Sequence, residues 1–173
     1  GEVLQLNRRD RQQPETIALA DFLRNLVDEI VQAENIPPGG VQLAIPEELV
    51  VIFDRGHFNQ ILWNLVRNAW QHCQKKEASV RIAARAGYMG DAVIFELADD
   101  GPGIPAELRG QIFEPFFTTR PGGTGLGLYI ARELADANGA TLELLPKSPG
   151  AHFRMTLKRA SAAASAPAAQ PEA

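Results

Sequence analysis

Residues 116–135 read FFTTRPGGTGLGLYIARELA and change character twice within this short stretch. Four glycines and one proline stand before and at the start of a predicted amphipathic helix, whose first backbone N–H groups have no intrahelical acceptor. No Gly-Lys-Ser/Thr follows, so this is not a Walker loop, and glycines at 123, 125 and 127 do not match the dinucleotide fingerprint. The stretch therefore predicts either a flexible helix cap or a loop whose backbone approaches a phosphate.

Helices and strands are mixed along the chain without strict alternation. An apolar stripe at helical spacing follows Asp21, which we expect to cap the first helix. The mixed pattern predicts an α/β fold, a two-layer sandwich of about three helices on a mixed, mostly antiparallel sheet. Helices are expected at 21–35, 57–73 and 126–137, and strands at 41–45, 49–54, 79–87, 91–100, 140–145 and 152–157.

The composition excludes several classes of protein. The 173 residues, 45% of them hydrophobic, fit one globular domain, and a net charge of −4 argues against a nucleic-acid partner. Cys73 is the single cysteine, which excludes an intrachain disulfide, and the three histidines are too scattered for a zinc pattern. No run approaches the roughly 18 apolar residues of a membrane helix. We therefore expect a cytoplasmic segment without direct membrane contact.

The two ends of the chain differ in composition from the part between them. The chain starts at Gly1 without Met, which is typical of a piece of a longer protein, and residues 1–14 read as a helix end or linker. Residues 159–173 are rich in Ala and Pro and predict a disordered tail. The domain itself is expected at 15–158.

Two asparagines stand four residues apart on the second predicted helix. Asn64 and Asn68 project from the same side and flank its apolar stripe. They are either solvated amides on an exposed face or functional groups next to the core, where an unpaired amide is costly. The functional interpretation is a carbonyl oxygen on Mg²⁺ and a neighbouring amide near phosphate.

A second polar motif, ADDGPGIP, follows the strand that ends near Asp99. It reads either as an ordinary Asp/Gly/Pro turn or as a site in which the strand end fixes a carboxylate. The glycines would then leave room for a flat ligand. A carboxylate accepts a hydrogen bond from the exocyclic amine of adenine, whereas guanine presents a carbonyl there, and a buried mismatch of acceptors costs a few kcal/mol.

In this order, the motifs resemble the N, G1, F and G2 boxes of the sensor histidine kinases of two-component systems. These kinases belong to the GHKL superfamily, which includes DNA gyrase B and Hsp90. The resemblance covers roughly 15–158 and implies the Bergerat-type ATP-binding sandwich. The matching stretches are DRGHFNQILWNLVRNAWQH at 54–72, DDGPGIP at 99–105, IFEPFFTTR at 112–120 and GTGLGL at 123–128.

The resemblance also implies a set of site residues for ATP and Mg²⁺. Asp99 would read adenine, Asn68 would bind Mg²⁺, and Asn64 and Arg120 would act in catalysis near the phosphates. Residues 104–124 would form a mobile ATP lid, with Phe113, Phe116 and Phe117 anchoring it or facing a partner domain. The nucleotide-binding set is Asn64, Asn68, His72, Asp99, Gly101, Gly103, Ile104, Thr119, Arg120, Gly123, Thr124, Gly125, Leu126, Gly127 and Leu128.

The chain departs from the family pattern in two places. None of its histidines lies in the acceptor motif, and the family often has Lys or Arg where this chain has Gln71, which leaves Arg120 as the cation for the γ-phosphate. His57 is interpreted as structural, and His72 is either a ligand contact or a satisfied, partly buried side chain. The expected partners are a separate dimerisation and histidine-phosphotransfer domain and a response regulator.

The stretches NAWQHC at 68–73 and LNRRDRQQPE at 6–15 and the simple C-terminus resemble the nitrogen-regulation-like kinases. This resemblance implies an inner-membrane sensor acting on a σ54-activating response regulator. Two other functions stay open. One is another GHKL ATPase or an anti-sigma-type serine kinase, although Asn64 stands where the ATPases of the group carry a Glu base. The other is a non-catalytic scaffold, which the presence of Asn68, Asp99 and the glycines at 123–127 opposes.

Overall fold

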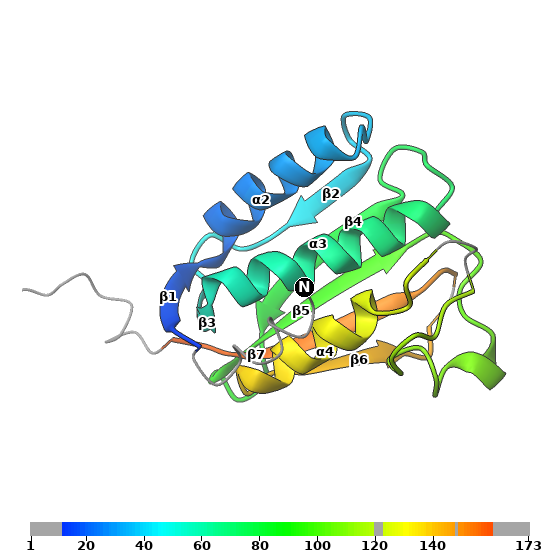
Figure 1. Cartoon of the computed structure of the whole chain (residues 1–173). Coiled ribbons are helices and arrows are strands. Elements are labelled where there is room, and N and C mark those ends of the chain that lie inside the picture. Colours follow the sequence, from blue (N-terminus) through cyan, green and yellow to red (C-terminus); the bar gives the residue numbers. More distant parts are fainter. Residues whose placement is uncertain (1–11, 120–122, 148, 161–173) are drawn as a thin grey trace, which may run out of the picture.

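A computed structural model describes residues 12–119, 123–147 and 149–160. Three helices lie over one face of a five-stranded sheet (Figure 1). They are α2 (Leu19–Ala33), α3 (Arg55–His72) and α4 (Gly127–Ala137). The expected two-layer α/β sandwich is confirmed.

The main sheet has the strand order β2-β4-β5-β7-β6. Only the pairing of β2 with β4 is parallel, so the sheet is mixed and mostly antiparallel, as expected. The last strand in the described chain, β7, lies inside the sheet between β5 and β6. The strands are β2 (Val41–Ala44), β4 (Val80–Ala86), β5 (Ala92–Asp99), β6 (Thr141–Leu145) and β7 (His152–Lys158).

A second, two-stranded sheet joins both ends of the domain. Strand β1 (Pro14–Ala18) pairs antiparallel with β3 (Val50–Asp54), and Arg159 forms an isolated bridge to Val51. The prediction of two strands at 41–45 and 49–54 is confirmed, although they belong to different sheets. Strand β1 was not predicted. The expected domain boundary at residue 15 therefore falls within a strand, and the expected helix end at 1–14 lies mostly outside the described residues.

The prediction that Asp21 caps the first helix is wrong. Helix α2 begins at Leu19, and its N-cap residue, Ala18, provides no side-chain hydrogen bond. The backbone N–H of Leu19 donates to the carbonyl of Leu49 at 3.1 Å, and Leu19 and Ala20 are buried. The earlier start thus buries two more apolar residues and still satisfies a backbone donor. Asp21 instead lies in the first turn, 2.6 Å from Arg24.

Helix α3 carries the predicted apolar stripe into the core. It begins at Arg55 rather than at residue 57 because the Asp54 carboxylate accepts a hydrogen bond from the N–H of His57 at 3.0 Å. Phe58 then packs among Phe22, Phe53 and Phe95, with ring centroids 5.0, 4.9 and 6.2 Å apart respectively. This packing fixes the rotation of α3 about its axis. The buried residues of the helix are Phe58, Ile61, Leu62, Leu65, Val66 and Ala69.

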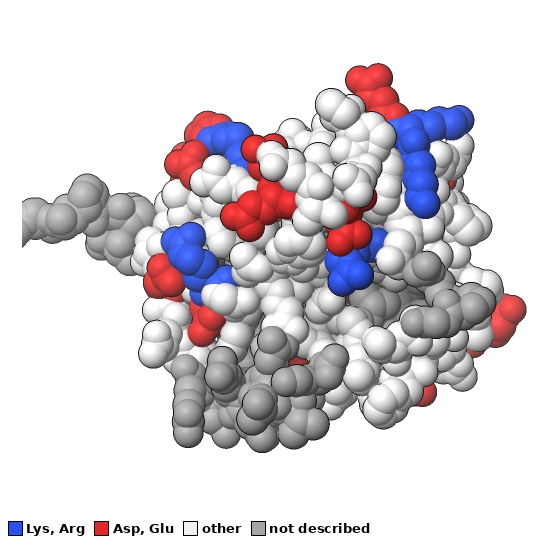
Figure 2. Space-filling model, turned by 45° about the horizontal axis from the view of Figure 1, so that its top comes forward, with Lys and Arg blue, Asp and Glu red and all other residues white. Residues whose placement is uncertain are grey.

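Charges of both signs are interspersed on the face drawn in Figure 2. Arg24 pairs with Glu47 at 2.7 Å, and Arg55 pairs with Glu15 at 3.3 Å. The described residues of that face therefore form no single-sign basic patch of the kind that nucleic-acid binding favours. None of the described helices is long and apolar enough to cross a membrane.

Candidate functional site

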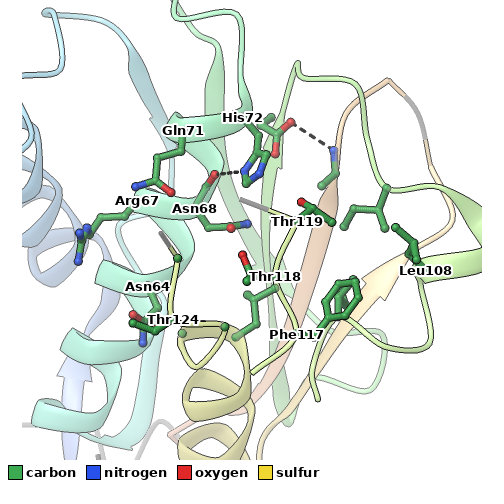
Figure 3. Close-up of a pocket in the computed structure, with 18 of the residues that line it drawn as sticks. Asn64, Arg67, Asn68, Gln71, His72, Leu108, Phe117, Thr118, Thr119 and Thr124 are labelled. Atoms are coloured by element: carbon green, nitrogen blue, oxygen red, sulfur yellow. Dashed lines mark hydrogen bonds between the residues drawn. The ribbon is translucent and has the colours of Figure 1, made fainter. Parts of the chain in front are cut away.

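A cavity of about 490 Å³ opens between α3, the start of α4 and the segment that follows β5 (Figure 3). Its size falls within the range of small-molecule sites. Most of the predicted nucleotide-binding residues line it, although they come from three separate stretches of sequence. These residues are Asn64, Asn68, His72, Asp99, Gly103, Ile104, Thr119, Gly123, Thr124, Gly125, Gly127 and Leu128.

Three predicted residues are not among those lining the cavity. A Cβ on Gly101 would lie 2.2 Å from the carbonyl oxygen of His72, so this glycine lets the end of β5 meet the end of α3. Leu126 is the N-cap residue of α4, and its N–H donates to the Thr124 hydroxyl at 3.3 Å. Arg120 lies outside the described residues. Gly101 and Leu126 therefore shape the site rather than face it.

The two asparagines of α3 differ in how their amides are satisfied. The Nδ2 atom of Asn64 is buried and has no hydrogen-bond partner. Asn68 points from α3 towards Thr118 and Thr119 (Figure 3). Its backbone carbonyl is 2.8 Å from Nδ1 of His72, which fixes that ring at the cavity wall. An unpaired buried donor is unfavourable, and a ligand with acceptor oxygens would satisfy it.

Asp99 is held by backbone groups at the end of β5. It is 2% exposed, and its Oδ1 atom accepts hydrogen bonds from the N–H groups of Gly101 at 2.8 Å and Ala151 at 3.3 Å. A Cβ on Gly150 would fall 1.8 Å from the Asp99 carbonyl oxygen, so the β6–β7 connection can pass here only as glycine. The carboxylate is thus fixed in orientation at the cavity wall, and no hydrogen bond from a described residue uses its Oδ2 atom.

Asp100 serves a different purpose, although it adjoins Asp99. Its carboxylate accepts hydrogen bonds from the N–H of Gln74 and the hydroxyl of Ser79, both at 2.8 Å. Desolvation raises the pKa of Asp100, but these hydrogen bonds outweigh it and lower the pKa below the ordinary value. Asp100 does not line the cavity. It joins the end of β5 to the turn after α3.

The segment after β5 is fixed in its middle and exposed at one aromatic residue. It contains a short 3₁₀ helix, Ala106–Leu108. Phe113 packs edge-on against Phe153 at 6.1 Å and lies under Arg132 at 4.5 Å. Phe117 lines the cavity, whereas Phe116 is 73% exposed. Phe113 is therefore packed and Phe116 is exposed, and their expected roles as lid anchor and partner contact stay predictions. The mobility of the lid stays a prediction.

A backbone hydrogen bond joins the F box to the G2 box. The N–H of Phe116 donates to the carbonyl of Gly125 at 2.8 Å, and both residues have positive φ, 70° and 73°. A Cβ on Gly125 would lie 2.4 Å from the carbonyl carbon of Phe116. The glycine at 125 is thus required by a close approach as well as by its conformation.

Several residues that line the cavity were missing from the predicted nucleotide-binding set. Leu108 and Ile112, four residues apart, contribute apolar walls, and Phe117 lies near Leu108 (Figure 3). Arg67 also lines the cavity, beside Gln71. Leu108, Ile112 and Arg67 gave no local sequence signal, because the first two lie in an irregular segment and an arginine on a helix is ordinarily solvated. His57 lies elsewhere, 3.0 Å from Asn138, in agreement with a structural role.

The sequence and fold match those of known proteins. The model of the histidine kinase-, DNA gyrase B-, and HSP90-like ATPase family matches residues 53–161, more than half of the chain. The chain belongs to this family. It is an ATP-binding ATPase domain of the kind found in sensor histidine kinases. The predicted GHKL superfamily is confirmed.

The individual proteins that the chain resembles are sensor histidine kinases. The chain is 35% identical over 158 residues to the sensor protein kinase PilS of Pseudomonas aeruginosa, covering 89% of this chain and 30% of PilS. The catalytic domain of the histidine kinase ThkA, nucleotide-free, has a TM-score of 0.71 at 29% identity, covering 86% of this chain and 99% of ThkA's. Full-length ShkA in complex with AMPPNP has a TM-score of 0.75 at 27% identity, covering 93% and 35% respectively. The chain thus spans less than a third of PilS.

Proposed function

We propose that this domain binds ATP with Mg²⁺ and presents the γ-phosphoryl group to a histidine on a separate dimerisation domain. The observation that carries the proposal is the convergence of Asn64, Asn68, Asp99 and the glycine-rich start of α4 on one cavity. These groups suit the two ends of a nucleotide. A response regulator of the σ54-activating type would receive the phosphoryl group next.

The adenine end of the cavity lies at Asp99. Because Oδ1 of Asp99 accepts backbone hydrogen bonds, Oδ2 remains to accept one from the exocyclic amine of adenine. Ile104, Leu108 and Ile112 supply apolar surface for the flat ring. A guanine carbonyl at this point would face another acceptor, so the site favours adenine.

The phosphate end of the cavity lies between α3 and α4. A Cβ on Gly127 would lie 3.4 Å from Oδ1 of Asn64, so the first turn of α4 and the unpaired amide of Asn64 face the same space. Leu126 provides no side-chain cap to α4, so its first N–H groups stay available to an anion. Both features supply donors to phosphate oxygens.

The donor set of the cavity also fits Mg²⁺. The described residues contain no cluster of three His, Cys, Asp or Glu side chains for a metal. Mg²⁺ at nucleotide sites is bound through few protein ligands together with phosphates and waters. The amide oxygen of Asn68 would supply the protein ligand. When bound, Mg²⁺ neutralises charge on the phosphate oxygens.

The acceptor histidine must come from another part of the protein. The side chain of His152 is hydrogen-bonded to the carbonyl of Pro149 at 2.9 Å. His72 contacts Asn68, and His57 contacts Asn138. Catalysis by this domain is then positioning of the nucleotide, with Asn64 and Arg120 near the transferred group. The similarity to the sensor protein kinase PilS supports a sensor kinase as the whole protein. We further propose that the whole protein lies in the inner membrane and that this segment lies in the cytoplasm.

Titration with ATP and a non-hydrolysable analogue, with and without Mg²⁺, tests the proposal. We expect both ligands to bind more tightly with Mg²⁺, and Asn68→Ala to lose this enhancement while metal-free binding stays largely intact. Equal losses in Mg²⁺ and in EDTA would contradict the role of Asn68 as a metal ligand. Incubation with γ-labelled ATP should leave no acid-labile label on the isolated domain, and label on any of its histidines would overturn the need for a separate acceptor.

A further inference from the structure

Arg67 lies on α3 and has no role in the nucleotide site as described so far. It precedes Asn68 in the chain and lines the same cavity. Of the described residues lining the cavity, it alone carries a permanent positive charge. ATP bound here would bring several negative charges to the phosphate end, so the chemistry of this arginine bears on which nucleotide is preferred.

The guanidinium of Arg67 is engaged with a carboxylate of another helix. Its Nε atom lies 3.3 Å from Oε2 of Glu34, the C-cap residue of α2. Figure 3 shows the side chain pointing away from Asn68. The two side chains are 51% and 29% exposed. Exposed ion pairs contribute little to stability, so the contact can be exchanged for a stronger one.

The position of Arg67 relative to Gln71 adds a second argument. Asn64, Arg67 and Gln71 are spaced three and four residues apart, which places them along one strip of the helix surface. Gln71, where related kinases often carry a cation, offers only a neutral amide. Arg67 lies about one helical turn, or roughly 5.4 Å, nearer to Asn64, a distance that an arginine side chain can span.

We propose that Arg67 binds the terminal phosphate of the nucleoside triphosphate and that Glu34 holds Arg67 away from the phosphate end of the cavity until the nucleotide binds. This inference rests on the proposed ATP-binding function. A guanidinium binds phosphate through paired, charge-assisted hydrogen bonds, and these outweigh a partly exposed contact with a single carboxylate. Glu34 then competes with the γ-phosphate for Arg67. The pair discriminates ATP from ADP, because ADP lacks the group for which Arg67 must leave Glu34.

Calorimetric titration with Mg-ATP and Mg-ADP tests the proposal. Four forms of the protein are compared: the wild type, Arg67→Gln, Glu34→Gln and the double variant. We expect Arg67→Gln to weaken ATP binding about tenfold, since a charge-assisted hydrogen bond is lost, with little effect on ADP. Glu34→Gln should tighten ATP binding by up to about fivefold, because the competing pair is removed. In the Arg67→Gln background, the same change at Glu34 should have almost no effect.

The opposite signs separate this mechanism from a structural ion pair, because loss of a purely structural pair would affect both single variants alike. Equal weakening of ATP and ADP by Arg67→Gln would overturn the proposal. So would an equal gain from Glu34→Gln in both backgrounds, which would indicate simple repulsion of ATP by Glu34. Failure of the wild type to bind either nucleotide would refute the ATP-binding function itself.

Two further variants control for folding and for overall charge. Arg67→Lys keeps the charge but loses the planar guanidinium, so we expect an ATP affinity between those of the wild type and Arg67→Gln. Arg24→Gln removes an arginine that also pairs with carboxylates, Glu47 and Asp21, but lies outside the cavity. It should leave both affinities unchanged. A loss of ATP affinity in Arg24→Gln equal to that in Arg67→Gln would reduce the effect to net charge and overturn the proposal.

Discussion

Asp99 and Asp100 are adjacent in the chain, but their carboxylates are used in opposite ways. Asp99 lines the nucleotide cavity and has one oxygen fixed by backbone N–H groups. Asp100 is turned away from the cavity and ties the end of β5 to Ser79 and to the turn after α3. The same substitution at the two positions therefore separates ligand recognition from folding.

Asp99→Asn should reduce ATP affinity at least tenfold, or about 1.4 kcal/mol, because an amide NH₂ replaces the acceptor for the adenine amine. The remaining amide oxygen can still accept from Gly101, so the melting temperature should stay close to wild type. Asp100→Asn should do the reverse, with a lower melting temperature and unchanged affinity of the folded protein. Calorimetry and thermal unfolding measure both quantities. If the two variants bind ATP equally well, Asp99 is only part of a turn.

The lowered pKa of Asp100 makes its contribution to stability depend on pH. A carboxyl group whose pKa is lower in the folded than in the unfolded state stabilises the fold above the unfolded value of about 3.9. This stabilisation is lost as the pH falls through the folded value. The difference in free energy of unfolding between wild type and Asp100→Asn should therefore be largest near neutral pH and shrink towards about pH 3. Urea unfolding over this range measures it, and a difference independent of pH would contradict the prediction.

Asn64 should show a conflict between stability and binding. Its Nδ2 atom is buried without a partner, so Asn64→Leu removes an unfavourable group of similar size. We expect the free energy of unfolding without nucleotide to stay the same or rise by about 1 kcal/mol, while ATP affinity falls. Denaturant unfolding and ATP titration give the two values.

Asn138 provides the matched comparison, because its amide is fully used. It accepts from the N–H of Asp54 at 2.9 Å and donates to the Leu134 carbonyl at 2.8 Å. Asn138→Ala should therefore destabilise the fold by about 1–3 kcal/mol. A similar loss of stability in Asn64→Leu would show that the Asn64 amide has a structural partner.

The crossing of Phe116 and Gly125 can be tested with one methyl group. Gly125→Ala places a Cβ against the backbone of Phe116 at a positive φ, which costs about 1–3 kcal/mol. We expect lower stability together with weaker ATP binding, since this backbone lines the cavity. Gly110 lies in the same predicted lid segment, and a Cβ on it would have no other atom within 4 Å. Gly110→Ala should therefore change the free energy of unfolding by less than about 0.5 kcal/mol. The two variants would be indistinguishable if the crossing does not form.

The long amphipathic elements were predictable from sequence, and the short pairing β1–β3 was not. The stripe of α3 repeats over several turns, so its buried face follows from periodicity. In β1 only Ile17 is buried, and its partner β3 follows the whole of α2 and β2. A strand with one buried residue gives almost no periodic signal, and its existence depends on the distant partner.

The polar groups of the site were predictable because the motifs occur in a recognisable order, whereas the apolar wall was not. Ile112 is 5% exposed in the middle of a segment expected to be a lid. The neighbouring Phe113 is held by Phe153 and Arg132, which come from β7 and α4. Tertiary contacts of this kind leave no local pattern. Arg67 was missed because exposed arginines are ordinary on a helix, so nothing in the sequence distinguishes this one from a solvated side chain.

The central position of β7 has a consequence for the synthesis of the protein. During translation β5 and β6 are complete before the strand that joins them, so each presents an unpaired edge to solvent until residue 158 has left the ribosome. The two-stranded sheet is likewise closed by the bridge between Val51 and Arg159. The domain can therefore fold as a unit only after nearly all of its described residues have been made, and a nascent chain halted before β7 is expected to bind chaperones or aggregate.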